Sequence, residues 1–433
     1  MIAKLKQLVR NALARLEHLI HLDTAYILKG SFWLTIGQIA ATGTGFLVAT
    51  AFANFVPQEV YGNYKYTLSM VSILSIFTLP GLNIAVASAV AKGAEGSYLR
   101  SVQKKIHWGF LGSVVSFGVA AYYYFVESHS GLALAFVITG VFLPFMDSVG
   151  LYNTFLQSKK LFRESIVYFV TSQLLATLCI ILAIIFTKRL NIILLTYFAV
   201  WTAVRIFCFL KTLKKFPPNA VTDPATDSFG THLTITALFS NLTTYLDSLL
   251  LFHYLGPIQV AVYNIAVSPP EQIKGLSKNI PSLVLPKLSL RSIPEINTVL
   301  AKRLWWLFLI GLFSSVIYFF IAPPLFAIFF RTYHESLWYS QLFAFSLMLR
   351  LPLTFLTTTV QSKLTEQRKR WLYFGVIPQI VLVISLFSFT YLYGISGTIL
   401  SRYIYFAIGL VVTIMQWRFL TKQHDEQNSC SLK

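Results

Sequence analysis

Long apolar runs recur along the whole chain, and they constrain its fold more than any other feature. Of 433 residues, 56% are hydrophobic and only 12% are charged, whereas about a quarter of the residues in a typical soluble domain are charged. A run of about 20 apolar residues can cross a bilayer as a helix. The runs therefore predict an all-α polytopic membrane protein with about twelve transmembrane helices. The predicted spans are residues 31–55, 62–90, 106–126, 131–155, 165–187, 191–210, 231–255, 259–285, 304–324, 338–360, 371–393 and 395–417.

The basic residues support this division because they fall in alternate loops. The N-terminal segment, the even-numbered loops and the tail hold 26 Lys and Arg residues, and the odd-numbered loops hold only Lys188, Arg189 and Arg331. Positively charged loops stay on the cytoplasmic side of a membrane, so we expect both termini to be cytoplasmic. The net charge of +19 then reflects topology and attraction to anionic membrane lipid rather than binding of nucleic acid.

An internal repeat divides the predicted spans into two halves. "FANFVPQEV" from Phe52 and "FHYLGPIQV" from Phe252 share Phe, Pro and Val at an offset of 200, and "QSK" recurs at Gln157 and Gln361. Six spans per half give parallel six-helix lobes, an arrangement typical of transporters that work by alternating access. We expect a cytoplasmic amphipathic N-terminal helix, a first lobe, a linker rich in proline and aspartate, a second lobe and a cytoplasmic tail. The expected boundaries are residues 1–27, 28–212, 213–230, 231–418 and 419–433.

A few charged residues fall inside the predicted spans, where charge is costly. Arg350 lies in the middle of "LMLRLPLTF", and Arg402, Lys274 and Lys278 are also deep. Lys65 and Arg205 lie nearer the span ends, so we interpret them as side chains that snorkel to the membrane surface. Pro269 and Pro270 precede the two deep lysines and are expected to break or kink their span.

The acids within spans are fewer, namely Asp147, Asp247 and Glu271. One interpretation is that each neutralises a deep cation as a structural pair. Measured from the repeated "QSK", however, Asp147 and Arg350 lie at nearly equal depth in equivalent spans. We therefore also consider that these two face each other across a cavity, and that the three acids act in gating or in coupling to an ion.

Three stretches resemble a known family of membrane proteins. "GSFWLTIGQIAATGTGFLVATAFANFVPQEVYGNYKY" from Gly30, "LPGLNIAVASAVAKG" from Leu79 and "PSLVLPKLS" from Pro281 are similar to the Wzx-type polysaccharide flippases of the multidrug/oligosaccharidyl-lipid/polysaccharide exporter superfamily. The resemblance implies a V-shaped bundle of twelve helices in the bacterial or archaeal-type cytoplasmic (inner) membrane. It implies transfer of an undecaprenyl-diphosphate-linked oligosaccharide to the outer leaflet, with a polysaccharide polymerase and a chain-length regulator as partners. Lipid II flippases are relatives that typically carry fourteen spans.

A lipid diphosphate would explain why cations are kept inside the spans, because arginine can bind phosphate oxygens in a bidentate fork. We predict Arg350, Arg402, Lys274 and Lys278 as the anion-binding set. Polar groups on the same spans are candidates for contact with sugars, and nothing in the sequence ranks them. They are Gln38, Asn83, Asn153, Asn241, Gln272 and Gln361.

Other functions remain open at this point. A multidrug exporter of the same superfamily would favour acids in its cavity, whereas here deep bases outnumber acids. A glycan polymerase or ligase would need catalytic groups near the outer face, and no nucleophile–base arrangement is evident. No paired His or Cys spacing indicates a metal, and no "GxxxxGK[ST]" loop indicates nucleotide hydrolysis. We therefore expect no cofactor, with a proton or sodium gradient as a possible source of energy.

Overall fold

The computed structural model describes residues 24–277, 292–363 and 374–431, and this part of the chain contains helices but no β-strand. Residues 1–23 of the N-terminal segment expected at 1–27, and the "PSLVLPKLS" stretch, lie outside the described residues. We call α2–α9 the N-lobe and α10–α16 the C-lobe. The N-lobe contains α2 (Thr24–Phe55), α3 (Gln58–Leu74), η1 (Ser75–Thr78), α4 (Gly81–Ala91), α5 (Gly96–Phe125), α6 (Ser130–Met146), η2 (Val149–Leu151), α7 (Tyr152–Ser158), α8 (Phe162–Thr187) and α9 (Leu190–Lys215). The C-lobe contains α10 (Ala225–Leu255), α11 (Pro257–Ser277), α13 (Ile293–Phe329), α14 (His334–Ala344), α15 (Leu347–Lys363) and α16 (Ile377–Ser431).

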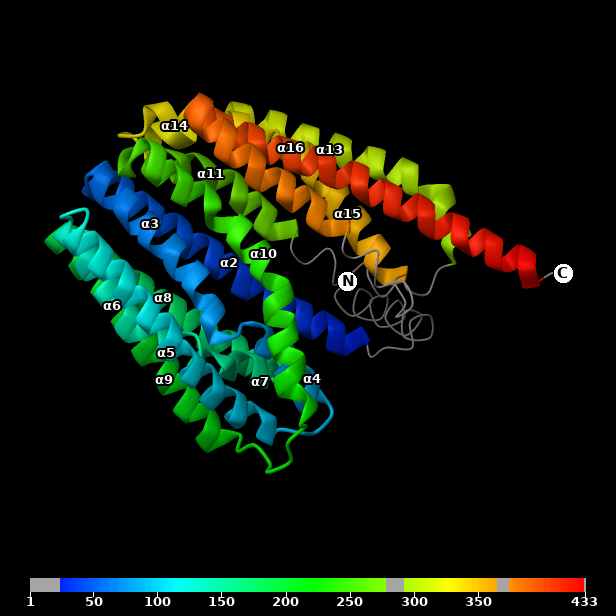
Figure 1. Ribbon diagram of the computed structural model, residues 1–433, viewed down its shortest axis with the longest axis horizontal. Coiled ribbons are helices and arrows are strands. Elements are labelled where there is room, and N and C mark those ends of the chain that lie inside the picture. Colours follow the sequence, from blue (N-terminus) through cyan, green and yellow to red (C-terminus); the bar gives the residue numbers. More distant parts are fainter. Residues whose placement is uncertain (1–23, 278–291, 364–373, 432–433) are drawn as a thin grey trace, which may run out of the picture.

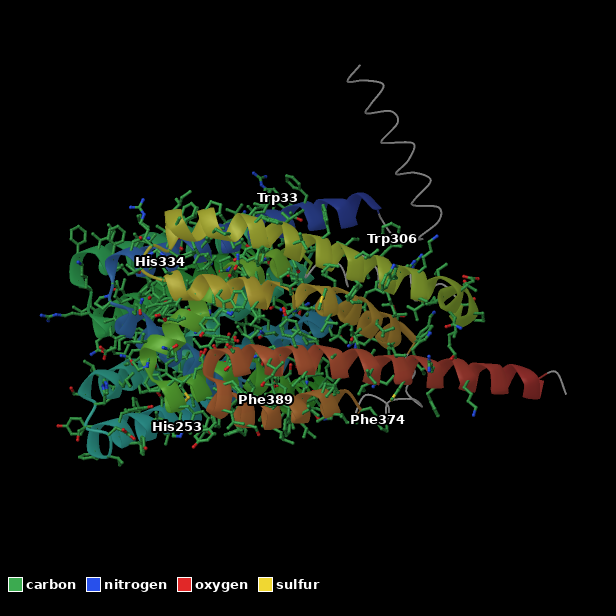
Figure 2. All side chains as sticks on the ribbon, turned by 90° about the horizontal axis from the view of Figure 1, so that it is seen from above. Trp33, His253, Trp306, His334, Phe374 and Phe389 are labelled. Carbon is green, nitrogen blue, oxygen red and sulfur yellow. The ribbon has the colours of Figure 1, made fainter. Side chains whose placement is uncertain are left out.

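The two lobes form a V (Figure 1). They meet near α3, α11 and α14 and diverge toward the other end of the bundle, except that the first half of α10 packs against α4 of the N-lobe. Figure 2 shows His253 and His334 at the end where the lobes meet, and Trp306 and Phe374 at the other. We call the first the closed end and the second the basic end, because the predicted lysine- and arginine-rich loops adjoin Trp306 and Phe374.

The helices follow the apolar runs of the sequence. By length and hydropathy, seven of the described helices can cross a membrane, or up to nine if each bent pair is one span. The bent pairs are α3 with α4, at 47°, and α14 with α15, at 42°. The expected total of twelve fits this layout, because α5 and α11 lie on two further predicted spans and α16 covers the last two. The long apolar helices confirm a multi-pass membrane protein.

Proline and left-handed residues mark the interruptions. Leu79 has a φ of 52° directly before Pro80 at the break between α3 and α4, and Gly256 has a φ of 82° directly before Pro257. Gly394, with a φ of 58°, separates the two halves of α16. Glycine adopts this region at little cost, and proline disfavours a helical residue before it. Pro269 and Pro270 do not break the helix, because α11 continues through both of them.

The internal repeat corresponds to equivalent structural positions. In the first half, α2 ends at Phe55 and α3 begins at Gln58; in the second, α10 ends at Leu255 and α11 begins at Pro257. These four helices lie at the junction of the lobes, where α3 packs against α11. The repeated element therefore positions the surfaces that the two lobes share.

Candidate substrate cavity between the lobes

A cavity of about 1460 Å³ lies between α3 of the N-lobe and the C-lobe helices α10, α11, α15 and α16. Its lining extends from Lys65 to Phe229, Gln361 and Gln416. Phe229 lies in the first turns of α10 and Gln361 in the last turn of α15, and these helix ends point toward the basic end (Figure 1). Pockets for drug-sized ligands usually occupy about 300–1,000 Å³. The cavity is therefore large enough for an extended substrate and reaches toward the basic end.

Arg402 on α16 is held by Asp247 on α10. Its Nη2 and Nε lie 2.7 Å and 2.8 Å from the two carboxylate oxygens, and Nη2 also donates to the Thr243 carbonyl at 3.1 Å. The Tyr263 hydroxyl donates to the same carboxylate. The Asp247 side chain is only 5% exposed. This bidentate pair satisfies the guanidinium inside the bundle and joins α16 to α10.

Arg350 on α15 is held by Glu271 on α11. Nη1 of Arg350 lies 2.6 Å from Oε1 of Glu271, and its guanidinium lies 5.3 Å from the centre of the Phe406 ring. Both charged residues line the cavity. The interpretation of paired structural charges is therefore correct for Arg350 and Arg402, and each pair connects two helices of the C-lobe.

Lys65 also lines this cavity, on the N-lobe side. Its Nζ lies 5.5 Å from the centre of the Tyr61 ring. Within the described residues, no carboxylate lies within 4 Å of it and no hydrogen bond satisfies it. The prediction that Lys65 snorkels to the membrane surface was wrong, because α3 turns this side chain into the space between the lobes.

Asp147 lies in the N-lobe and does not face Arg350. Its Oδ2 is 2.9 Å from Nζ of Lys105 and accepts a hydrogen bond from Thr78 at 2.8 Å. Lys105 is fully buried and also donates to Asn83 at 2.9 Å. The hypothesis of a pair across the cavity was therefore wrong, because a lysine on the neighbouring helix α5 takes the carboxylate.

This polar cluster joins two interrupted helices. Thr78 ends η1, directly before the bend to α4, and Asp147 follows the last residue of α6. Arg205 donates to the Met146 carbonyl at 2.7 Å and lies over the Trp201 ring. The expectation that Arg205 snorkels was also wrong, because it satisfies a carbonyl at the interrupted end of α6.

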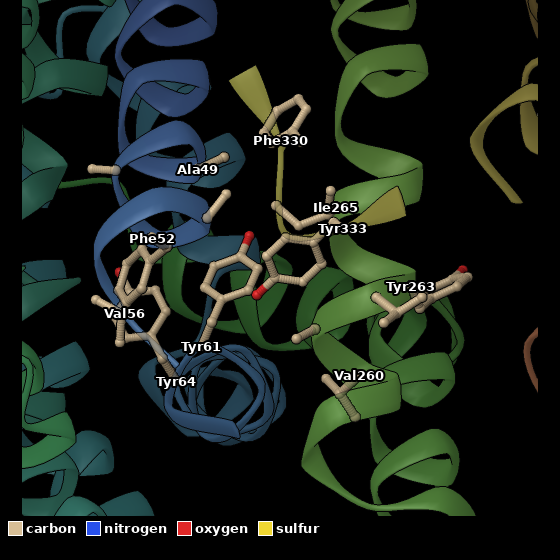
Figure 3. Close-up of a cluster of buried hydrophobic side chains, with 14 of the residues drawn as sticks. Ala49, Phe52, Val56, Tyr61, Tyr64, Val260, Tyr263, Ile265, Phe330 and Tyr333 are labelled. Atoms are coloured by element: carbon tan, nitrogen blue, oxygen red, sulfur yellow. The ribbon is translucent and has the colours of Figure 1, made fainter. Parts of the chain in front are cut away.

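The lobes are in direct contact at the closed end (Figure 3). Tyr61 of α3 packs edge-to-face against Tyr333, which lies between α13 and α14, with ring centres 6.4 Å apart. Asn54 donates to the Phe329 carbonyl at 2.8 Å and Gln58 to the Thr332 carbonyl at 2.8 Å. These contacts separate the cavity from the surface at the closed end.

The other predicted site residues have different positions. Lys274 belongs to the last turns of α11, where its side chain is outside the described part, and Lys278 lies outside the described residues. All six polar side chains predicted to contact sugars are described, and of these Gln361 lines the cavity. Asn83 instead binds Lys105, and Asn153 accepts from Ser165.

Sequence reasoning missed Lys105 and Lys65 as residues of the interior. Lys105 was counted with the loops because it directly precedes an apolar run. It belongs, however, to a stripe of buried residues four apart on α5: Ser97, Ser101, Lys105, Gly109 and Ser113. Such a stripe of small and polar residues indicates a helix face packed against other helices. For Lys65, the signal is the polar face that it shares with Ser69 and Ser72.

The comparison with family models matches residues 27–289 to a family described as polysaccharide biosynthesis protein. The match covers more than half of the chain. The chain belongs to this family. The membership agrees with the resemblance to polysaccharide flippases seen in the sequence. The comparison with curated protein sequences finds no match.

Several solved structures share this fold. The lipid II flippase MurJ in an inward closed conformation is 15% identical, with a TM-score of 0.63 over 91% of this chain and 90% of that one. A multidrug resistance MATE family transporter in an inward-facing conformation is 13% identical, with a TM-score of 0.64 over 88% and 96%. A transporter from Pyrococcus furiosus, whose binding pocket is described as having reverse polarity, is 12% identical, with a TM-score of 0.57 over 92% and 96%. At these identities the likeness concerns the fold.

Proposed function

We propose that this member of the polysaccharide biosynthesis family is a flippase for undecaprenyl-diphosphate-linked oligosaccharide repeat units. It moves them from the inner to the outer leaflet by alternating access, for synthesis of a cell-surface polysaccharide. The observation that carries the proposal is a large cavity, between two lobes, whose charges sum to a positive excess. A lipid-linked sugar needs this combination of space and anion-binding charge.

The charged residues described in the cavity lining are Lys65, Arg350, Arg402, Asp247 and Glu271. Each of the two carboxylates forms an ion pair with one arginine. The formal charge that remains is the positive charge of Lys65. Hydroxyl and amide groups such as Ser69, Thr357 and Gln361 line the same space and can donate to phosphate and sugar oxygens. An organic cation, the substrate class of a multidrug exporter, would be repelled by the net positive charge of this lining.

The contacts at the closed end and the cavity toward the basic end support a mechanism by alternating access. If the basic end is cytoplasmic, as the distribution of charged loops predicts, the cavity receives substrate from the cytoplasmic leaflet. Separation of Tyr61 from Tyr333 would then admit the head group to the outer side. The lipid tail stays in the bilayer throughout, so the lobes need to pass only the diphosphate and sugars.

The proposal places the protein in the bacterial or archaeal-type cytoplasmic membrane, with both termini in the cytoplasm. Its product would be consumed by a reaction that joins repeat units on the outer face, so a polymerase and a chain-length regulator are the expected partners. For proton or sodium coupling, a cation would have to compete with the arginine or lysine that each of Asp147, Asp247 and Glu271 now binds.

Purified protein in proteoliposomes tests the proposal. The vesicles carry undecaprenyl-diphosphate-linked oligosaccharide, and membrane-impermeant periodate reports which sugars face outward. We expect the protein to speed the appearance of inner-leaflet sugars at the outer face. A parallel assay follows efflux of ethidium, an organic cation, from the same preparation. Transport of ethidium without movement of the lipid-linked sugar would contradict the proposal and favour a multidrug exporter.

A further inference from the structure

We propose that Lys65 is the phosphate-binding group of the N-lobe, and that it supplies the uncompensated charge to which the lipid diphosphate binds. The inference rests on the proposed function and deepens it by assigning the site of the diphosphate. It differs from the pattern predicted from the sequence, which placed the anion on Arg350, Arg402, Lys274 and Lys278 of the C-lobe.

The ion pairs of the cavity single out Lys65. Both Nη2 and Nε of Arg402 bind Asp247, and Nη1 of Arg350 binds Glu271. An anion that approached either arginine would also approach a carboxylate of like charge, and the repulsion would offset much of the attraction. Among the described charged residues of the lining, Lys65 alone has no such partner.

The surroundings of Lys65 can hold phosphate oxygens. Ser69 and Ser72 follow it at four and seven residues on α3, so the three lie on one face of the helix, and all three line the cavity. The Ser69 hydroxyl can donate to a phosphate beside the ammonium group, which has three donors of its own. The Ser72 hydroxyl donates to the Leu68 carbonyl at 2.9 Å and would exchange that bond for one to the phosphate. Charge-assisted hydrogen bonds of this kind are about twice as strong as neutral ones.

Lys65 also lies directly beside the contact that holds the lobes together. It is one helical turn from Tyr61, and its ammonium group lies over the Tyr61 ring, while that ring packs against Tyr333 of the C-lobe. A phosphate bound at Lys65 competes with the ring for the ammonium group. Occupation of the site therefore acts on a residue of the closed end, which gives the substrate a direct way to favour separation there.

Binding of farnesyl diphosphate to the purified full chain tests the assignment. The variants are Lys65→Gln, Lys65→Arg and, as a matched control, Lys92→Gln, which removes an exposed lysine outside the cavity. We expect Lys65→Gln to weaken binding by about 10- to 100-fold, the loss of one hydrogen bond to a charged group. Lys65→Arg should bind within about threefold of the wild type, since it keeps the charge, and Lys92→Gln should bind equally well. Farnesol, without phosphate, should bind all four proteins alike.

The possible results separate the inference from the proposed function. Wild-type binding that Lys65→Gln leaves unchanged would overturn the assignment and leave the flippase proposal intact. A wild type that binds farnesol as tightly as the diphosphate would contradict both. Inorganic pyrophosphate is included as a ligand, and equal affinity for it would identify a site for a free anion instead. If Lys65→Gln does not fold, Lys65→Cys in a cysteine-free background replaces it, and aminoethylation of that thiol should restore binding.

Discussion

At the scale of single residues, three ion pairs inside the bundle join neighbouring helices, and Lys65 remains without a carboxylate partner among the described residues. Arg402 with Asp247, Arg350 with Glu271 and Lys105 with Asp147 each connect two helices of one lobe. The sequence showed that all of these residues except Lys105 are deep, but pairing depends on which helices become neighbours. The contact of α10 with α16 joins residues that are 155 positions apart in the sequence. No local sequence pattern predicts a pairing over such a separation.

We expect the Arg402 pair to be necessary for stability. Asp247→Leu leaves the Arg402 guanidinium without its carboxylate, and Arg402→Met leaves the Asp247 carboxylate without its guanidinium. Removal of one partner of a buried pair costs about 3 to 5 kcal/mol, whereas replacement of both by apolar residues is often nearly neutral. Each single variant should therefore lower the unfolding temperature in detergent more than the double variant does. Losses that simply add in the double variant would show that the two side chains do not interact.

At the scale of helices, the boundaries follow from the sequence more closely than the contacts do. Apolar length predicted the spans, and proline or glycine marks most of the breaks between them. The break after α6 could not be predicted in this way, because Pro144 lies inside the helix and the interruption follows three residues later. There Lys105 and Arg205, from two other helices, satisfy Asp147 and the Met146 carbonyl.

The crossing of α3 and α11 depends on Gly62. A Cβ atom at Gly62 would lie 1.8 Å from the Pro257 carbonyl oxygen, whereas one at Gly43 on α2 would meet nothing within 4 Å. Because α3 and α11 belong to different lobes, Gly62→Ala should push the lobes apart at the closed end, and Gly43→Ala should not. Overpacking of this kind costs about 1–3 kcal/mol.

Thiol labelling measures this effect. Val56 is buried beside Tyr61 at the closed end, so Val56→Cys, in a background without the three native cysteines, reports access to the contact. A membrane-impermeant maleimide should react faster when Gly62→Ala is present and at an unchanged rate with Gly43→Ala. Equal rates in all three proteins would mean that α3 and α11 do not control closure.

At the scale of the whole molecule, two lobes of like topology enclose a cavity. At the closed end, contacts between the lobes separate this cavity from the surface. The repeat of "FANFVPQEV" and "FHYLGPIQV" predicted parallel halves, and the family match and the solved transporters agree with that architecture. Arg350 and Arg402 were predicted in the interior and line the cavity, but the place of Lys65 was not predictable, because it depends on how the lobes face each other. Because Lys65 lies near the end of a predicted span, the sequence indicated a side chain at the membrane surface, whereas it lines the cavity.

The central claim, that substrate crosses by separation of the lobes at the closed end, is tested most directly by a reversible link across that contact. Gln58 and Thr332 already meet there, with the Gln58 amide 2.8 Å from the Thr332 carbonyl oxygen. In the cysteine-free background, Gln58→Cys and Thr332→Cys are joined by a reducible bifunctional thiosulfonate, and movement of undecaprenyl-diphosphate-linked oligosaccharide is followed in proteoliposomes. We predict that the linked protein still binds farnesyl diphosphate but does not move the lipid, and that reduction restores movement. Unchanged movement by the linked protein would contradict the account.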